Sequence, residues 1–113
     1  MGAVVAKGLV ASGKSCEGVV RLVSRVADVF ALMQRPDLGE TILLTESATA
    51  TAVVPLLDRV RGLICTSGGL TSHLAIVSRE FGLPCIMGAE LADPSDLDGV
   101  RVLMAADGTV SRV

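Results

Sequence analysis

Residues 63–84 read LICTSGGLTSHLAIVSREFGLP. The apolar run at 63–65 predicts a buried strand, and the Thr-Ser-Gly-Gly that follows predicts a turn whose backbone can approach a ligand closely. A helix is expected next, because Leu74, Val77 and Phe81 recur at helical spacing and form an apolar stripe suited to burial. The closing Gly-Leu-Pro of the stretch ends this helix. The order is therefore strand, glycine turn, helix.

The only histidine of the chain, His73, falls in the first turn of this helix, whether Thr71 or Ser72 is the N-cap. The first backbone N–H groups of a helix are unpaired and carry partial positive charge, so they disfavour a protonated imidazole. Because the ordinary pKa of histidine is about 6.5, the neutral and nucleophilic ring predominates near neutral pH. A phosphoryl group accepted by that ring would lie beside these N–H donors and beside Gly68 and Gly69, which favours a phosphohistidine.

Residues 68–84 resemble the phosphohistidine segment of the mobile, or swivelling, domain of phosphoenolpyruvate-utilising enzymes. This group includes pyruvate phosphate dikinase, phosphoenolpyruvate synthase, rifampicin phosphotransferase and enzyme I of the sugar phosphotransferase system. Its members read Gly-Gly-x-Thr-Ser-His-x-Ala-Ile-(small)-(small)-Arg-(Glu or Gly)-x-Gly-(Ile or Leu)-Pro, and here only the surroundings of Ser78 and Cys85 look unusual. The resemblance implies that His73 carries the phosphoryl group. It also implies an α/β fold, a three-layer β/β/α swivelling domain with a partly parallel sheet.

The residues around the histidine have structural roles and, by resemblance, functional ones. Thr71 and Ser72 are suited to capping the helix, and each hydroxyl could also donate to a phosphoryl oxygen. In some relatives the threonine at the place of Thr71 is a regulatory phosphorylation target. Gly68 and Gly69 form a tight turn and could offer amides to the phosphate. Arg79 matches the family arginine, but six residues place it about 120° round the helix from the histidine, so pairing with a carboxylate or a partner is favoured.

Length and composition limit the number of domains and the other kinds of function that the chain could have. A length of 113 residues predicts one domain, residues 1–113, and a hydrophobic content of 50% with only 2% aromatic residues favours strands buried on both faces. A net charge of -2 without Trp or Tyr disfavours nucleic-acid binding, and no apolar run reaches the roughly 18 residues of a membrane helix. Cys16, Cys65 and Cys85 lack the spacing of a metal site, so reduced thiols in a cytoplasmic protein are expected.

The segment Gly8–Ser15 reads GLVASGKS and satisfies the phosphate-binding pattern Gly-x4-Gly-Lys-Ser. Such a loop works only when a helix follows it and points its N-terminus at the phosphates. Residues 16–23 contain Gly18 and several β-branched residues, which predict a strand instead. We therefore expect a turn between two strands in which Gly13 has a positive φ angle, and keep nucleotide binding as an alternative.

The rest of the chain alternates between helical and extended patterns. The expected helices cover 26–33, with Val26, Val29, Phe30 and Met33 on one face, and 48–60, which Pro55 kinks or splits and Arg59, Arg61 and Gly62 close. The other expected strands cover 41–45, 85–87, 101–104 and 109–113, and residues 88–97 are expected to form a loop or a short helical turn. This order predicts an α/β domain with a parallel portion.

The sequence thus predicts a phosphoryl-carrier domain or subunit, in which His73 accepts a phosphoryl group at one active site and passes it to an acceptor at another. The chain offers no nucleotide pocket or metal cluster of its own, so it is expected to bind no cofactor tightly and to be inactive alone. Mg²⁺ and ATP or phosphoenolpyruvate are expected on partners, a nucleotide-binding subunit and a phosphoenolpyruvate- or acceptor-binding subunit. A second alternative is a non-catalytic interaction module of the same fold.

Overall fold

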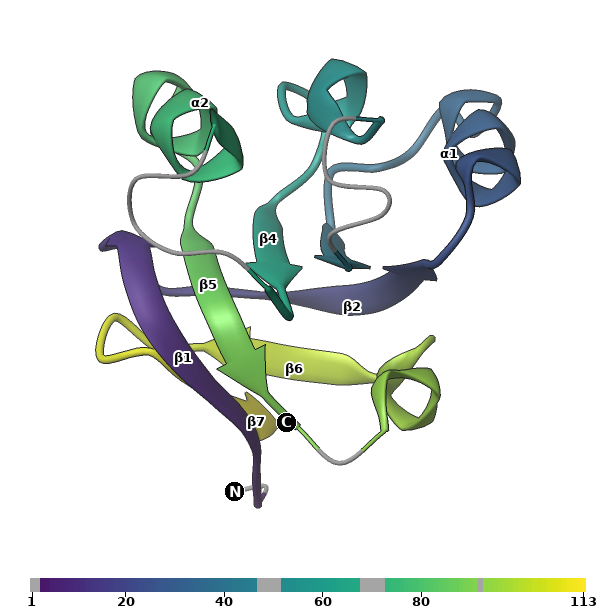
Figure 1. Ribbon diagram of the computed structural model, residues 1–113. Coiled ribbons are helices and arrows are strands. Elements are labelled where there is room, and N and C mark those ends of the chain that lie inside the picture. Colours follow the sequence, from purple (N-terminus) through teal and green to yellow (C-terminus); the bar gives the residue numbers. More distant parts are fainter. Residues whose placement is uncertain (1–2, 47–51, 68–72, 92) are drawn as a thin grey trace.

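The computed structural model describes residues 3–46, 52–67, 73–91 and 93–113. Within these residues, seven strands close into a barrel (Figure 1). The strands are β1 (Val4–Ser12), β2 (Cys16–Val23), β3 (Thr41–Thr45), β4 (Gly62–Cys65), β5 (Cys85–Glu90), β6 (Arg101–Met104) and β7 (Thr109–Arg112). The helices are α1 (Val26–Met33) and α2 (His73–Phe81), with the 3-10 turns η2 (Val54–Leu56) and η3 (Pro94–Leu97).

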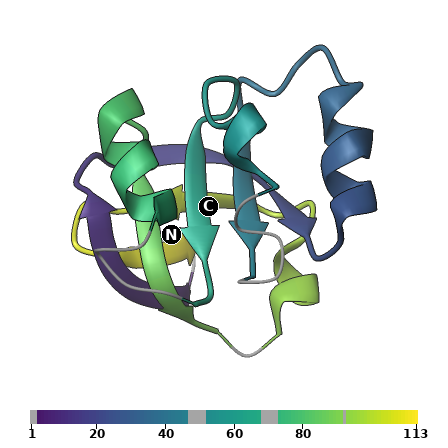
Figure 2. The ribbon, with the colours of Figure 1, turned by 45° about the horizontal axis from the view of Figure 1, so that its top comes forward.

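The barrel has a parallel half and an antiparallel half. Strand β2 pairs with β3, β3 with β4 and β4 with β5 in parallel, whereas the four pairings that involve β1, β6 and β7 are antiparallel. Parallel neighbours need crossover connections, and here α1, η2 and α2 lie in those connections, on one side of the barrel (Figures 1 and 2). The predicted α/β class with a partly parallel sheet is confirmed.

The predicted division into β/β/α layers is not what the strands show. Strand β1 pairs with both β5 and β7, and β2 pairs with both β3 and β6, so hydrogen bonds join the two halves at both edges. Closing the sheet in this way leaves no unpaired edge among the described strands. The described architecture is a single closed barrel covered on one side by helices, rather than two separate sheets and a helix layer.

The core consists of two apolar clusters, one on each face of the parallel strands. Along β3 and β4 the side chains alternate, so that Leu43 and Leu63 join the cluster beneath the helices while Ile42 and Ile64 fill the barrel. All four of these side chains are fully buried. Burial of each such side chain stabilises the fold by about 1.5–3 kcal/mol. Because both faces of these strands are buried, consecutive positions are apolar, which explains the apolar runs of β3 and β4.

The Gly8–Ser15 segment does not have the structure of a nucleotide-binding loop. Strand β1 runs to Ser12 and β2 begins at Cys16, so a strand follows the glycine-lysine-serine, as the sequence predicts. Residues 13–15 connect the two strands, as expected, but Gly13 is not among the glycines with a positive φ angle, so that part of the expectation is wrong. The two strands are not neighbours in the barrel. Gly8 instead permits close approach of β1 to β5, since a Cβ there would lie 2.7 Å from the Met87 carbonyl oxygen.

The long helix predicted at 48–60 is not formed by its described part, which begins at residue 52. Hydrogen bonds from Leu56 N–H to the Val53 carbonyl and from Leu57 N–H to the Val54 carbonyl define a 3-10 turn that contains Pro55. Proline lacks the N–H that a longer α-helix would need, and the buried Leu56 and Leu57 hold the turn against the core. Tertiary packing therefore overrides the helical periodicity of this segment.

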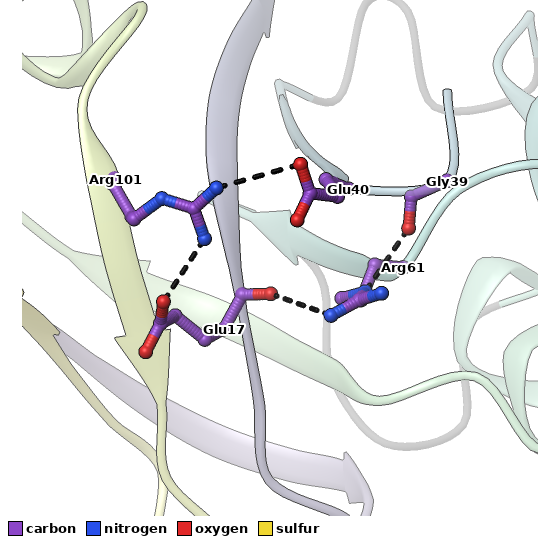
Figure 3. A network of polar contacts seen from close by, with 5 residues as sticks. All are labelled: Glu17, Gly39, Glu40, Arg61 and Arg101. Carbon is purple, nitrogen blue, oxygen red and sulfur yellow. Dashed lines mark hydrogen bonds and ion pairs between the residues drawn. The ribbon is translucent and has the colours of Figure 1, made fainter. Parts of the chain in front are cut away.

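Arg59 and Arg61 bind carbonyl groups of other segments instead of closing a helix of their own. Arg59 donates to the carbonyls of Met33 and Arg35, at the end of α1, and Arg61 Nε donates to the Gly39 carbonyl at 3.0 Å. In the network of Figure 3, Arg61 also donates to the Glu17 carbonyl. These contacts link the segment between η2 and β4 to the end of α1, to the residues before β3 and to β2.

The remaining polar contacts of this network join β2, β6 and the residue that precedes β3. The Arg101 guanidinium lies 2.9 Å from the Glu17 carboxylate and 3.5 Å from that of Glu40 (Figure 3). All three side chains are substantially exposed, so solvent screens the pairs and their role is mainly to set the relative position of the strand ends.

The helix predicted at 26–33 is confirmed, but its buried face differs from the expected one. The buried side chains of α1 are Val29 and Leu32, whereas Val26, Phe30 and Met33 are exposed. The strands predicted at 41–45, 101–104 and 109–113 are also confirmed, the last ending at Arg112. β5 extends three residues beyond the predicted 85–87.

Candidate functional site

The site predicted from the sequence lies at the start of α2, on the helix side of the barrel (Figure 1). Strand β4 leads toward it and ends at Cys65, and α2 begins at His73. Gly68, Gly69, Thr71 and Ser72 lie outside the described residues, so their expected capping and phosphate contacts remain predictions.

Helix α2 packs on the barrel through a different set of residues than the predicted stripe. Leu74 is buried as expected, but Ala75 and Ser78 complete the buried face, whereas Val77 is half-buried and Phe81 is 54% exposed. At 100° per residue Leu74, Ala75 and Ser78 span one arc, and the small side chains of the latter two let the helix approach the strands closely. Phe81 lies at the last position of the helix, outside this contact.

The helix ends at Gly82, as predicted. Gly82 has a φ angle of 65°, its N–H donates to the Arg79 carbonyl, and the Leu83 N–H donates to the Ser78 carbonyl at 2.9 Å. This pair of bonds is a Schellman motif, in which glycine supplies the left-handed conformation that other residues adopt at a cost. The chain then turns directly into β5, so the orientation of α2 is set at this end.

His73 is exposed, at the end of α2 opposite the Schellman motif. On the helical wheel it lies about 140° from Ser78 and 160° from Ala75, so its side chain projects away from the barrel. Ile76 and Glu80 are also exposed and lie within about 60° of it on the same face. An imidazole in this position can be reached by a large donor molecule. Phosphoryl transfer to His73 would require this accessibility.

Arg79 lies on another side of α2 and nearly two turns from the histidine. Its Nε donates to the Ala11 carbonyl at 2.8 Å, near the end of β1. This contact is with backbone, and the carboxylate or partner that the sequence predicts for this arginine stays a prediction. It anchors the helix to β1, so Arg79 influences His73 through the position of α2.

The cysteines near α2 behave as small apolar residues. Cys65 and Cys85 are buried in the cluster beneath the helices, and no disulfide joins them. Burial raises the pKa of the Cys85 thiol to about 11, so this group is protonated at physiological pH. It is therefore not a competing nucleophile.

Two residues near the histidine were not anticipated from the sequence. Ile76 and Glu80 share the exposed face of His73, which the spacing of three and seven residues could have indicated.

The described residues contain no cluster of three or more His, Cys, Asp or Glu side chains that could hold a metal ion. In this part of the chain, moreover, no helix has the length and apolar character needed to span a membrane.

Comparison with known proteins gives both sequence and structural relatives. The sequence model of the family described as "PEP-utilising enzyme, mobile domain" matches residues 38–109. The chain is 35% identical over 101 residues to a rifampicin phosphotransferase of Bacillus subtilis, covering 89% of this chain and 11% of that protein. It is 35% identical over 106 residues to a phosphoenolpyruvate synthase of Pyrococcus furiosus, covering 94% of this chain and 12% of that protein. It thus spans about a tenth of these curated relatives.

Solved structures extend the likeness to the fold. The structure titled "N-terminal domain of Enzyme 1 - Nitrogen" matches with a TM-score of 0.55 and 32% identity, over 70% of this chain and 33% of that one. Aconitase X of Thermococcus kodakaraensis matches with a TM-score of 0.64 over 96% of this chain and 97% of that one, at 18% identity. The second likeness concerns the fold alone, because the identity is low.

Proposed function

Since the chain belongs to the mobile-domain family of PEP-utilising enzymes, we propose that it is a phosphoryl carrier whose His73 accepts a phosphoryl group at one active site and delivers it at another. The observation that carries the proposal is the exposure of this imidazole, the only one in the chain, on the outward face of α2. A carrier must present the same atom to two different active sites in turn. A side chain that projects from a rigidly anchored helix meets this need.

The chemistry requires two displacements at phosphorus. An unprotonated ring nitrogen of His73 attacks the terminal phosphorus of the donor, an N–P bond forms, and the leaving group departs with the electron pair of the broken P–O bond. At the second site an oxygen of the acceptor attacks the same phosphorus, and the pair of the N–P bond returns to the imidazole. The chain's own residues hold the ring in position, while charge neutralisation comes from elsewhere.

The donor and acceptor sites are proposed to lie on partner domains or subunits. The two curated relatives are about nine times longer than the shared segment, which leaves room for such sites in those proteins. We propose a nucleotide-binding partner and a phosphoenolpyruvate- or acceptor-binding partner, where Mg²⁺ and ATP or phosphoenolpyruvate are held. Around His73, Gly68, Gly69, Thr71 and Ser72 are proposed to contact the phosphoryl oxygens, and Thr71 is a candidate for regulatory phosphorylation.

Intact-mass spectrometry tests the carrier role. The purified chain is incubated with an extract of the source organism and either ATP or phosphoenolpyruvate, and one phosphoryl adduct that is lost in acid and kept in base is expected. His73→Ala must abolish the adduct, and Ser67→Ala, a substitution of another described residue before α2, must not.

A second measurement distinguishes chemical access to the His73 ring from recognition of the chain by a protein partner. Potassium phosphoramidate phosphorylates exposed imidazoles without a protein partner, so it is expected to modify His73 in the wild-type chain. An adduct with phosphoramidate but with neither biological donor would refute the carrier role and leave the exposure of the ring intact. Enzymatic adduct formation that persists in His73→Ala would refute the assignment of the residue.

A further inference from the structure

The outward face of α1 is entirely apolar. Its exposed residues are Val26, Ala27, Phe30, Ala31 and Met33, and the exposed fractions of Val26, Phe30 and Met33 are 50%, 61% and 41%. These five positions occupy a continuous arc of about 160° on the helical wheel, opposite the buried Val29 and Leu32. We call these five residues the α1 face.

No polar side chain of α1 interrupts this face. Asp28 is the only polar residue of the helix, and its carboxylate accepts hydrogen bonds from the Ser24 and Arg25 N–H groups at 3.1 and 3.0 Å. These bonds lower the pKa of Asp28 and hold its side chain at the helix N-terminus. A helix that is apolar all round is normally buried, so α1 has the composition of a helix with a covering partner.

The α1 face and His73 lie on the same side of the molecule. Figures 1 and 2 both place α1, η2 and α2 together above the barrel, with α1 and α2 at the two ends of this row. A protein that reaches the imidazole from outside approaches this helix side. The same approach brings it toward the outward surface of α1.

Charges of both signs surround the face. Each arginine near the helix ends has an aspartate close to it in sequence, namely Asp28 after Arg25, Asp37 after Arg35 and Asp58 before Arg59. The apolar centre, and not the charge of the rim, is therefore the feature that a docking domain would recognise.

A second copy of the chain is a poorer fit. Two α1 helices packed face to face would contribute five side chains each, whereas a stable interface uses roughly 20–30 residues on each side. The face suits one portion of a larger surface that a different protein domain contacts.

We propose that the α1 face is a docking surface for the domain that phosphorylates His73. This inference rests on the proposed carrier function and adds a recognition element to it. Phe30 is its most exposed large side chain and serves as the anchor, because buried aromatic residues carry most of the energy of such contacts. The transferred group never touches α1, so Phe30 is a recognition residue and has no role in the chemical step.

The test is the initial rate of His73 phosphorylation as a function of chain concentration, with source-organism extract and the donor, ATP or phosphoenolpyruvate, that labels the wild-type chain. Phe30→Ser is compared with Phe30→Leu and with Leu103→Ser, a control at a 41%-exposed position on β6, away from α1 and α2 (Figure 1). Phe30→Ser is expected to raise the apparent KM about tenfold at unchanged maximal rate, the effect of losing one aromatic anchor. Phe30→Leu should restore most of the affinity, and Leu103→Ser should match wild type.

Other results overturn the inference in distinguishable ways. An unchanged KM in Phe30→Ser, or an equal rise in Leu103→Ser, excludes α1 as the docking surface while the carrier function stands. A fall in maximal rate alone assigns Phe30 to the chemical step and also refutes it. Sedimentation showing a dimer that Phe30→Ser dissociates assigns the face to a second copy, and flotation with phosphatidylglycerol vesicles that Phe30→Ser abolishes assigns it to a membrane. No adduct on the wild-type chain means that the carrier function itself fails.

Discussion

Replacing Gly8 with alanine tests whether the glycine-rich segment at the N-terminus serves the fold or a nucleotide. A Cβ at this position would lie 2.7 Å from the Met87 carbonyl oxygen, 2.7 Å from Ile86 Cγ2 and 3.0 Å from Ala89 Cα. All three neighbours belong to β5, and two of them are backbone atoms that cannot rotate away. Relief therefore requires β1 to move from β5, which strains the hydrogen bonds that join them.

The expected loss follows from the cost of overpacking. Inserting a methyl group into a fully packed position costs about 1–3 kcal/mol, and the backbone contacts place Gly8→Ala toward the upper end, about 2–3 kcal/mol. For a domain of this size that loss lowers the melting temperature by roughly 10 °C. Gly13→Ala is the matched control, because its nearest neighbour would be Val10 Cγ1 at 4.0 Å, and a change within about 0.5 kcal/mol is expected.

Urea unfolding followed by far-ultraviolet circular dichroism measures both variants, since the chain has no tryptophan or tyrosine for fluorescence. Calorimetric titration with Mg-ATP accompanies it and is expected to show no saturable binding by wild type, Gly8→Ala or Lys14→Ala. Equal stability of Gly8→Ala and Gly13→Ala would refute the packing argument. Saturable ATP binding that Lys14→Ala removes would restore the nucleotide-binding alternative.

Two other predictions concern α2 and β5. Leu74→Ala should lower the free energy of unfolding in urea by about 2–5 kcal/mol, because the Leu74 side chain is buried. Phe81→Ser should change it by less than about 0.5 kcal/mol, because the Phe81 ring is exposed. Equal losses would contradict the described packing. Burial raises the pKa of Cys85 from 9.0 to about 11, so the unfolded chain releases this proton first as the pH rises. The associated stability is present below pH 9 and should be lost between pH 9 and 11, and Cys85→Ala should flatten the measured profile in that window; an unchanged slope would refute it.

Much of the fold follows from local chemistry. The apolar runs at 41–45 and 63–65 predict strands buried on both faces, and the structure confirms β3 and β4 with every residue buried. Gly82 marks the end of α2 because only glycine adopts its left-handed φ angle without strain. The strand after Ser15 was predicted from β-branched residues and excludes the helix of a phosphate-binding loop.

Other features depend on contacts between distant residues. Periodicity predicts a helix at 48–60, but in its described part Pro55 and the burial of two adjacent leucines favour a 3-10 turn. The same reasoning assigned Phe81 to the buried face of α2, where the small Ala75 and Ser78 lie instead. Hydrophobicity identifies a side chain that could be buried, and only the approach of neighbouring elements decides whether it is.

The sequence by itself determined the family, the strand and helix order around His73 and the placement of that imidazole near a helix start, because these depend on spacing along the chain and on residue chemistry. The tertiary structure decided that the strands close into a barrel, that Arg79 is directed to β1, and that the outward face of α1 lacks a cover within the described chain. Each of these depends on which segments far apart in sequence pack together, and pairwise distance in space is not encoded in local periodicity.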